Sequence, residues 1–79
     1  MKIQVLGTGC SKCDKMMDRL GQLKKSGNYD FELEKVEDLV DIMSFGVMMT
    51  PGLVIDGKLI SQGKVYTPEK LEELLKQYQ

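Results

Sequence analysis

Histidine and tryptophan are both absent from this 79-residue sequence, and cysteine occurs only twice. The lack of histidine removes the commonest acid–base side chain and the commonest metal ligand. Two cysteines cannot form the several disulfides that stabilise a small secreted scaffold. These absences direct attention to Cys10 and Cys13, which are separated by two residues.

Long apolar runs and an excess of one charge are also lacking. Eleven basic residues against twelve acidic ones give a formal net charge of −1, so no overall field is available to attract nucleic acid or anionic lipid. The apolar stretch at residues 3–6 contains a glutamine and ends at Gly7. It is too short for a secretory signal, and no run approaches the roughly 18 residues that span a bilayer. We therefore expect a cytoplasmic protein, without nucleic-acid or membrane partners, in a reducing compartment.

The composition is that of a small globular domain. Hydrophobic residues make up 42% of the chain and charged residues 29%, a balance that differs from that of disordered segments. No linker, repeat or low-complexity segment interrupts the sequence, so we expect one domain over residues 1–79. A core of this size needs nearly every apolar side chain for packing.

Apolar periodicity and turn signals predict four strands and three helices. The strands are expected at residues 2–6, 29–36, 52–55 and 58–61. The first helix is expected to start at or near Cys10, its cap, and to end with Lys24 and Lys25 before Gly27. The others are expected at residues 37–45 and from Pro68 onward, the last capped by Thr67. The side chains expected to face inward on the second and third helices are Leu39, Ile42, Met43, Leu71, Leu74, Leu75 and Tyr78.

The order of these elements is β-α-β-α-β-β-α. A crossover helix between the first two strands makes them parallel, and the hairpin signal Asp56-Gly57 makes the last two antiparallel. The apolar first strand suits a central position, and the charged face of the second suits an edge. The expected fold class is α/β, with a four-stranded mixed sheet flanked by three helices.

Cys10 and Cys13 lie where the first strand gives way to the first helix. Residues three apart at a helix start can meet the geometry of a disulfide. The ring that they close is too small to stabilise the fold much, so the bond suits making and breaking. The helix N-terminus and Lys12 favour a thiolate at Cys10, while Asp14 opposes it. We therefore expect Cys10 to attack a partner's disulfide and the more buried Cys13 to resolve the mixed disulfide.

Thr50-Pro51 is the second feature of note. It immediately precedes an apolar strand that the fold would place beside the first one. The Thr50–Pro51 bond would then lie against the two cysteines. Met48 and Met49 precede it, and either they join the core or they form an adaptable apolar docking surface.

Together these features resemble the thioredoxin superfamily in its minimal, glutaredoxin-sized form. The closest resemblance is to the small redox-active disulfide proteins, or miniature thioredoxins, of archaea and bacteria. Residues 1–4 and 7–13 are similar to that family's N-terminal block, and residues 46–57 are similar to its second block. The resemblance covers essentially the whole chain and implies a minimal thioredoxin-like (glutaredoxin-like) fold.

The resemblance also implies roles for individual residues. Cys10 matches the nucleophile, Cys13 the resolving cysteine and Pro51 the cis-proline. Thr50 matches the residue whose backbone pairs with an extended substrate segment, and Gly63 matches the glycine of the docking rim. The remaining residues expected to contact substrate are Gly9, Ser11, Lys12 and Met49.

The implied activity is that of a thiol–disulfide oxidoreductase acting in electron transport and cell redox homeostasis. It would reduce protein disulfides as a monomer, with no cofactor besides the Cys10–Cys13 couple. Its partners would be a disulfide-containing client protein and a thioredoxin-reductase-like or other electron donor. Ser11-Lys12 replaces the inter-cysteine pairs of typical thioredoxins and glutaredoxins, which leaves the redox potential, the direction of electron flow and the use of glutathione open.

Two alternatives remain. Heavy-metal-binding domains also place a CxxC motif between a first strand and a first helix, and thiolates suit Cu(I) and Zn(II). Against this reading, such domains have a β-α-β-β-α-β order, and a closed zinc site needs four ligands. A non-catalytic binding or regulatory module on the same scaffold is the second alternative, and the intact Cys10 and Cys13 argue against it.

Overall fold

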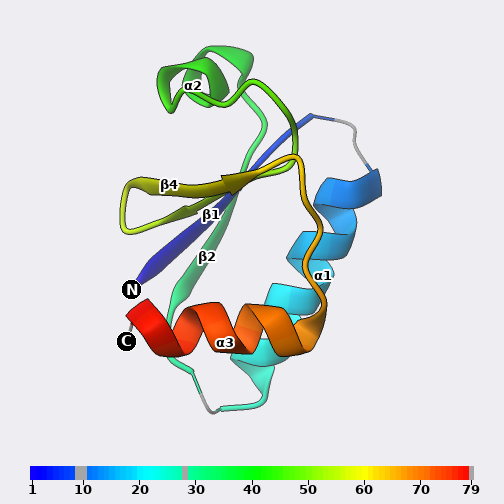
Figure 1. Ribbon diagram of the computed structural model, residues 1–79, viewed down its shortest axis with the longest axis vertical. Helices are drawn as coiled ribbons and strands as arrows, with labels where there is room; N and C mark the ends of the chain where they lie inside the picture. Colours follow the sequence, from blue (N-terminus) through cyan, green and yellow to red (C-terminus); the bar gives the residue numbers. More distant parts are fainter. Residues whose placement is uncertain (9–10, 28, 79) are drawn as a thin grey trace.

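The computed structural model describes residues 1–8, 11–27 and 29–78. Its elements, in chain order, are β1 (Lys2–Leu6), α1 (Ser11–Lys25), β2 (Glu32–Val36), α2 (Leu39–Ser44), β3 (Gly52–Ile55), β4 (Lys58–Gln62) and α3 (Pro68–Tyr78). This is the β-α-β-α-β-β-α order predicted from the sequence, and the chain has the minimal thioredoxin-like fold (Figure 1).

The four strands form one mixed sheet in the order β2-β1-β3-β4. β1 runs parallel to β2 and antiparallel to β3, and β3 runs antiparallel to β4. The apolar β1 is central, with Ile3, Val5 and Leu6 fully buried. Because β1 and β3 are antiparallel, Leu6 at the end of β1 pairs with Gly52 at the start of β3. The chain leaving β1 therefore lies beside the chain entering β3, and we call this the site end of the sheet.

The hairpin between β3 and β4 has the predicted turn. Asp56 and Gly57 both have positive φ, 51° and 81°, as the two central residues of a type I′ turn require. The pairing shifts register between Leu53 and Val54. β4 continues to Gln62, one residue beyond the predicted end, and so brings Gln62 to the site end.

Two layers of helix cover the sheet (Figure 1). α1 and α3 pack on one face, where the main core includes Val5, Cys13, Leu20, Leu53 and Leu71. α2 covers the site end of the other face, where the second cluster comprises Leu6, Val36, Ile42, Val47 and Val54. α3 begins as predicted, since the Thr67 hydroxyl oxygen accepts a hydrogen bond from the Lys70 N–H at 3.3 Å.

α2 differs from the prediction in length and orientation. The Asp38 carboxylate accepts hydrogen bonds from the N–H groups of Val40 and Asp41, so the helix starts at Leu39 and not at residue 37. A helix of six residues makes under two turns, and Ile42 is its buried residue. The prediction that Leu39 and Met43 face inward was therefore wrong, and both side chains are exposed. The presence of a helix here still separates the fold from the β-α-β-β-α-β order of heavy-metal-binding domains.

Two further predictions of local structure were wrong. β2 begins at Glu32, three residues later than predicted, because Tyr29 and Phe31 enter the core from the segment before the strand. Tyr78, predicted to be buried, is 37% exposed. Leu71 and Leu75 are the buried residues of α3, and the sheet and α1 leave Tyr78 in the last turn uncovered.

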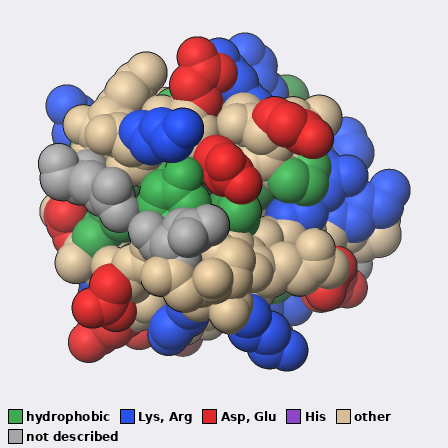
Figure 2. All heavy atoms as spheres, turned by 90° about the horizontal axis from the view of Figure 1, so that it is seen from below, with side chains coloured by type: hydrophobic (Ala, Val, Ile, Leu, Met, Phe, Trp, Pro, Cys, Tyr) green, Lys and Arg blue, Asp and Glu red, His purple; other side chains and the backbone are tan. Residues whose placement is uncertain are grey.

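Charges of both signs are mixed on the lower face of the molecule. Figure 2 shows lysine, arginine and acidic side chains interspersed around a small apolar area on that face. This agrees with the near-zero net charge. In the part of the chain that the structure describes, no helix has the length and apolar character needed to cross a membrane.

Candidate functional site

The start of α1 lies at the site end of the sheet, one short connection after β1. Ser11 and Lys12 are exposed in the first turn of the helix. Cys13, in the same turn, is 0% exposed. Cys10 and Gly9, predicted as the nucleophile and as a substrate contact, lie outside the described residues. The structure therefore describes Cys13, the predicted resolving cysteine, and all the predicted substrate residues except Gly9.

The Cys13 sulfur packs against Gly7, directly after β1, and the loop before β3 approaches the same glycine. A Cβ atom added to Gly7 would overlap the Cys13 Sγ and would lie 3.4 Å from the Thr50 Cβ. The Gly7 N–H donates a hydrogen bond to the Val36 carbonyl at 3.0 Å, which fixes this backbone against β2. Gly7 is thus the point at which α1 and the loop before β3 meet, and only glycine leaves room for the sulfur.

The loop before β3 has the geometry that the resemblance implies. The Thr50–Pro51 peptide bond is cis. Thr50 is exposed, whereas Pro51 is fully buried. The Pro51 carbonyl accepts a hydrogen bond from the Gly63 N–H at 3.0 Å. The loop is therefore held on one side by β4 and contacts Cys13's neighbour Gly7 on the other.

Gly63 and Met49 lie against each other beside this loop. A Cβ on Gly63 would lie 3.1 Å from the Met49 Cε and 3.2 Å from the Met49 Cβ, and Gly63 has a φ of +74°. Both requirements favour glycine at this position. The structure thus brings together Cys13, Thr50, Pro51, Met49 and Gly63, which are distant in the sequence.

Exposed apolar side chains are concentrated beside the same loop. Between α2 and Pro51, five large hydrophobic side chains are between 62% and 91% exposed: Leu39, Val40, Met43, Met48 and Met49. We call these five residues the 39–49 surface. Met48 and Met49 therefore do not join the core. That they form a docking surface for another molecule stays a prediction.

Two residues of the site, Gly7 and Gln62, were not predicted from the sequence. Gly7 stands at the end of a predicted strand, directly before the CxxC segment, and that position was the available signal. Gln62 gave no such signal beyond its place next to Gly63. Its Oε1 accepts hydrogen bonds from the backbone N–H groups of Met48, at 2.8 Å, and Met49, at 3.2 Å.

The charge of Asp14, which follows Cys13, is partly compensated by β2. Lys35 Nζ lies 3.0 Å from the Asp14 carboxylate and 3.4 Å from that of Glu37. The hydrogen bond to Asp14 raises the pKa of Lys35 above its ordinary value; partial desolvation opposes this, and the charges of Asp14 and Glu37 add to it. Asp14 therefore opposes a thiolate at the start of α1 less than the sequence suggested.

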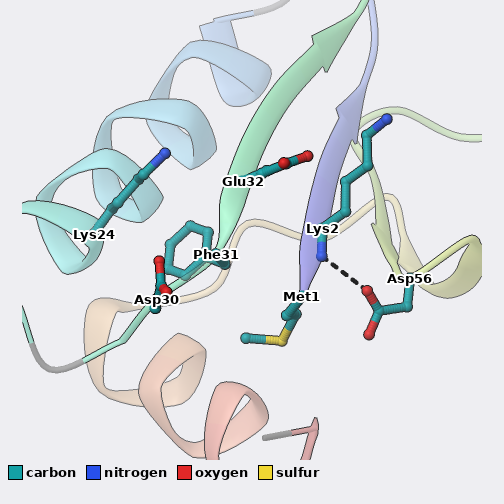
Figure 3. Close-up of a pocket in the computed structure, with 7 residues that line it drawn as sticks. All are labelled: Met1, Lys2, Lys24, Asp30, Phe31, Glu32 and Asp56. Carbon is teal, nitrogen blue, oxygen red and sulfur yellow. Dashed lines mark hydrogen bonds between the residues drawn. The ribbon is translucent and has the colours of Figure 1, made fainter.

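A hollow at the other end of the sheet offers no comparable chemistry. Figure 3 shows side chains from β1, α1, the hairpin and the segment before β2 around it, including Lys2, Lys24, Asp30 and Asp56. The charges are of both signs, and Asp56 accepts a hydrogen bond from the Lys2 N–H at 2.8 Å. Among residues 1–8, 11–27 and 29–78, no group of three or more cysteine or carboxylate side chains is arranged to hold a metal ion.

Comparisons with known proteins agree with this geometry. The sequence pattern of a thioredoxin domain family matches residues 1–76. A thioredoxin of Methanothermobacter thermautotrophicus is 35% identical over 75 residues, which cover 95% of this chain and 97% of that relative. A thioredoxin of Methanocaldococcus jannaschii is 33% identical over 76 residues, covering 96% of this chain and 87% of the relative. Both similarities extend over nearly the full length of the fold.

Proposed function

The chain belongs to the thioredoxin domain family, and on that premise we propose that it is a thiol–disulfide oxidoreductase that reduces protein disulfides. Cys10 is the nucleophile and Cys13 the resolving cysteine. The main support for the proposal is that the Cys13 sulfur and the loop of Thr50 both lie close to Gly7. A sulfur held close to a loop with an exposed residue, Thr50, is what exchange with an extended substrate needs.

The reaction proceeds in two exchange steps. The Cys10 thiolate attacks one sulfur of the client disulfide, forms a mixed disulfide and releases the other client sulfur, which takes up a proton. The Cys13 thiolate then attacks the Cys10 sulfur, closes the Cys10–Cys13 disulfide and releases the second client thiol. Two electrons pass from the protein to the client, and a thioredoxin-reductase-like or other donor returns them. Because Cys13 is buried, a client meets Cys10 first.

The surroundings of the site favour a protein client over a small molecule. Thr50 is exposed beside β3, and we propose that its backbone pairs with an extended segment of a client. The 39–49 surface continues from this loop onto α2 and offers apolar contacts that a small disulfide would not use. The protein acts as a monomer in the cytoplasm, with neither nucleic acid nor membrane as a partner.

Single-cysteine variants test the proposal. Cys10→Ser removes the attacking sulfur and abolishes the reduction of a disulfide-bonded peptide. Cys13→Ser stops the reaction after the first step, so the mixed disulfide between Cys10 and the peptide accumulates. Mass spectrometry without reductant measures the adduct. Equal adduct formation by both variants would contradict the assigned roles, and full activity in Cys10→Ser would contradict the proposed function.

A further inference from the structure

Gln62, the last residue of β4, contacts the loop that precedes the cis-proline. Its side-chain oxygen accepts hydrogen bonds from two successive backbone N–H groups, those of Met48 at 2.8 Å and Met49 at 3.2 Å. Gln62 itself is exposed, so it fills no place in the core. The contact joins β4 to a loop whose own side chains, Met48 and Met49, point largely into solvent.

The next residue of the chain holds the other side of the same loop. The Gly63 N–H donates a hydrogen bond to the Pro51 carbonyl at 3.0 Å. Gln62 thus fixes the backbone just before Thr50, and Gly63 fixes the backbone just after it. Thr50, which is exposed, lies between two anchored points.

We propose that Gln62 is a positioning residue for substrate docking, an inference that rests on the proposed function. Its side-chain carbonyl holds the backbone of Met48 and Met49 so that the backbone of Thr50 is already in place when a client segment pairs with it. A loop ordered before binding lowers the entropic cost of association. The loss of this restraint therefore weakens the binding of an extended client more than it affects the exchange of sulfur.

Substitutions at Gln62 separate the hydrogen-bond acceptor from the bulk of the side chain. Gln62→Met keeps a similar length and removes the acceptor, whereas Gln62→Glu keeps an oxygen in the same place. Gln62→Asn keeps the amide but is one methylene too short to reach both N–H groups. Gln77→Met on α3, at the far end of the molecule (Figure 1), is the matched control.

The test compares two substrates. One is a ten-residue peptide with a central cysteine in mixed disulfide with thionitrobenzoate, and the other is the small aromatic disulfide of the same thiol. Gln62→Met raises the KM for the peptide about fivefold, because it removes both hydrogen bonds that order the loop before binding, with kcat unchanged. The KM for the small disulfide changes much less. Gln62→Glu restores the peptide KM, and Gln62→Asn behaves like Gln62→Met.

Each other outcome has a distinct meaning. A peptide KM that stays at the wild-type value in both Gln62→Met and Gln62→Asn overturns the positioning role while the proposed function stands. The same holds if both substrates are affected equally, or if Gln77→Met has the same effect. If the wild-type protein reduces neither substrate, the proposed function fails, and the role of Gln62 falls with it. Circular dichroism of each variant identifies any that does not fold, and the remaining variant at Gln62 then decides.

Discussion

Glycines at the site end of the sheet and glycines elsewhere in the fold serve different purposes. A methyl group added at Gly7 would overlap the Cys13 sulfur, and one added at Gly52 would lie 2.8 Å from Val47 Cγ2. By contrast, a methyl group at Gly21 in α1 or at Gly57 in the hairpin would meet no atom within 4 Å. The first two glycines are needed because segments approach closely, and at Gly7 the approaching atom is the sulfur of Cys13, the predicted resolving cysteine.

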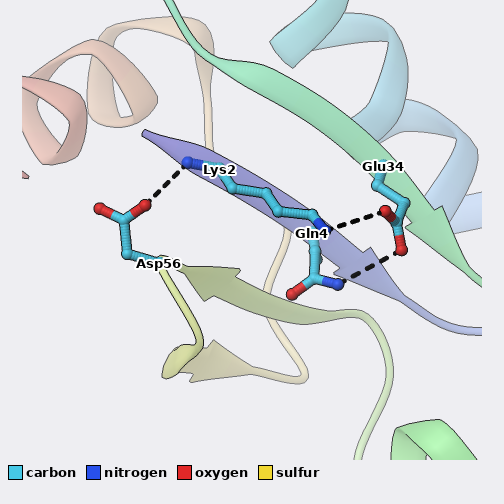
Figure 4. A network of polar contacts seen from close by, with 4 residues as sticks. All are labelled: Lys2, Gln4, Glu34 and Asp56. Atoms are coloured by element: carbon cyan, nitrogen blue, oxygen red, sulfur yellow. Dashed lines mark hydrogen bonds and ion pairs between the residues drawn. The ribbon is translucent and has the colours of Figure 1, made fainter.

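The polar contacts at the two ends of the sheet also hold different parts of the chain. At the site end, Gln62 and Gly63 bind the backbone of the loop beside Cys13. At the opposite end, Figure 4 shows exposed side chains joined to one another, Lys2 and Gln4 to Glu34, beside one hydrogen bond that the Lys2 N–H donates to the Asp56 carboxylate. Exposed ion pairs of this kind contribute little to stability. The backbone and the Cys13 sulfur are tightly restrained at the site end, so we expect substitutions at the two ends to have unequal effects.

The largest effect is expected from Gly7→Ala. Its methyl group must displace the Cys13 sulfur, which it would overlap, and overpacking of this kind typically costs about 1–3 kcal/mol. Disulfide reduction falls sharply because the resolving sulfur moves. Urea unfolding and the rate of peptide reduction measure the two effects.

The matched control for Gly7→Ala is Gly21→Ala, which should stabilise the protein by about 0.5–1 kcal/mol because alanine favours helix. Its activity should stay at the wild-type level. Similar stability and activity in the two variants would show that the site end is no more constrained than α1.

A smaller effect is expected from the 39–49 surface. Replacing Val40 and Met43 together with serine removes exposed apolar area, so folding stability should change by less than about 1 kcal/mol. The ratio of kcat/KM for a disulfide-bonded protein to that for a small disulfide should fall several-fold. Tyr78→Ser, which removes an exposed apolar side chain from α3, should leave the ratio unchanged. An unchanged ratio in the double variant would exclude this surface from client binding.

At the opposite end, Asp56→Ala should affect stability alone. It removes the hydrogen bond to the Lys2 N–H and places alanine at a φ of 51°, a conformation that Asp and Asn tolerate better. We expect a loss of about 1 kcal/mol in thermal or urea unfolding, with peptide reduction unaltered. Asp56→Asn keeps both properties and should restore most of the loss. A fall in activity with Asp56→Ala would show that the two ends are coupled.

The smallest effect concerns Lys35 and its dependence on pH. The folded-state pKa of Lys35 is raised above 10.5 by Asp14 and Glu37, so the charged lysine stabilises the folded protein below pH 10.5. That contribution disappears as the pH rises through the folded-state pKa. The stability difference between wild type and Lys35→Met should be constant from pH 7 to 9 and should shrink above about pH 10.5. A difference that does not shrink as the pH rises above 10.5 would contradict the assignment.

Local signals were sufficient to predict the fold. The apolar residues 2–6, the hairpin signal Asp56-Gly57 and the cap Thr67-Pro68 each determine an element largely by themselves, and the structure confirms all three. Apolar periodicity predicted the wrong inward-facing residues for α2, because a helix of under two turns is too short to bury a continuous apolar face. Leu39 and Met43 were therefore assigned to a core that does not reach them.

The hydrogen bonds and close contacts that restrain the site depend on tertiary structure, so local sequence signals do not predict them. Sequence reasoning selected Cys13, Thr50, Pro51 and Gly63, because a motif or a resemblance marked each of them. Neither a motif nor the resemblance pointed to Gln62, since its role depends on where the end of β4 lies relative to Met48 and Met49. A single side-chain oxygen bound to two backbone N–H groups is a property of the folded arrangement.

The central claim is that Cys10 and Cys13 form one redox couple at the site end of the sheet. A titration of the metal-free protein in thiol–disulfide buffers, with alkylation and mass spectrometry as the readout, tests it most directly. We predict that both cysteines become protected from alkylation together, within one chain, as a single two-electron transition. A pair that never closes, or that closes only between two chains, would contradict it.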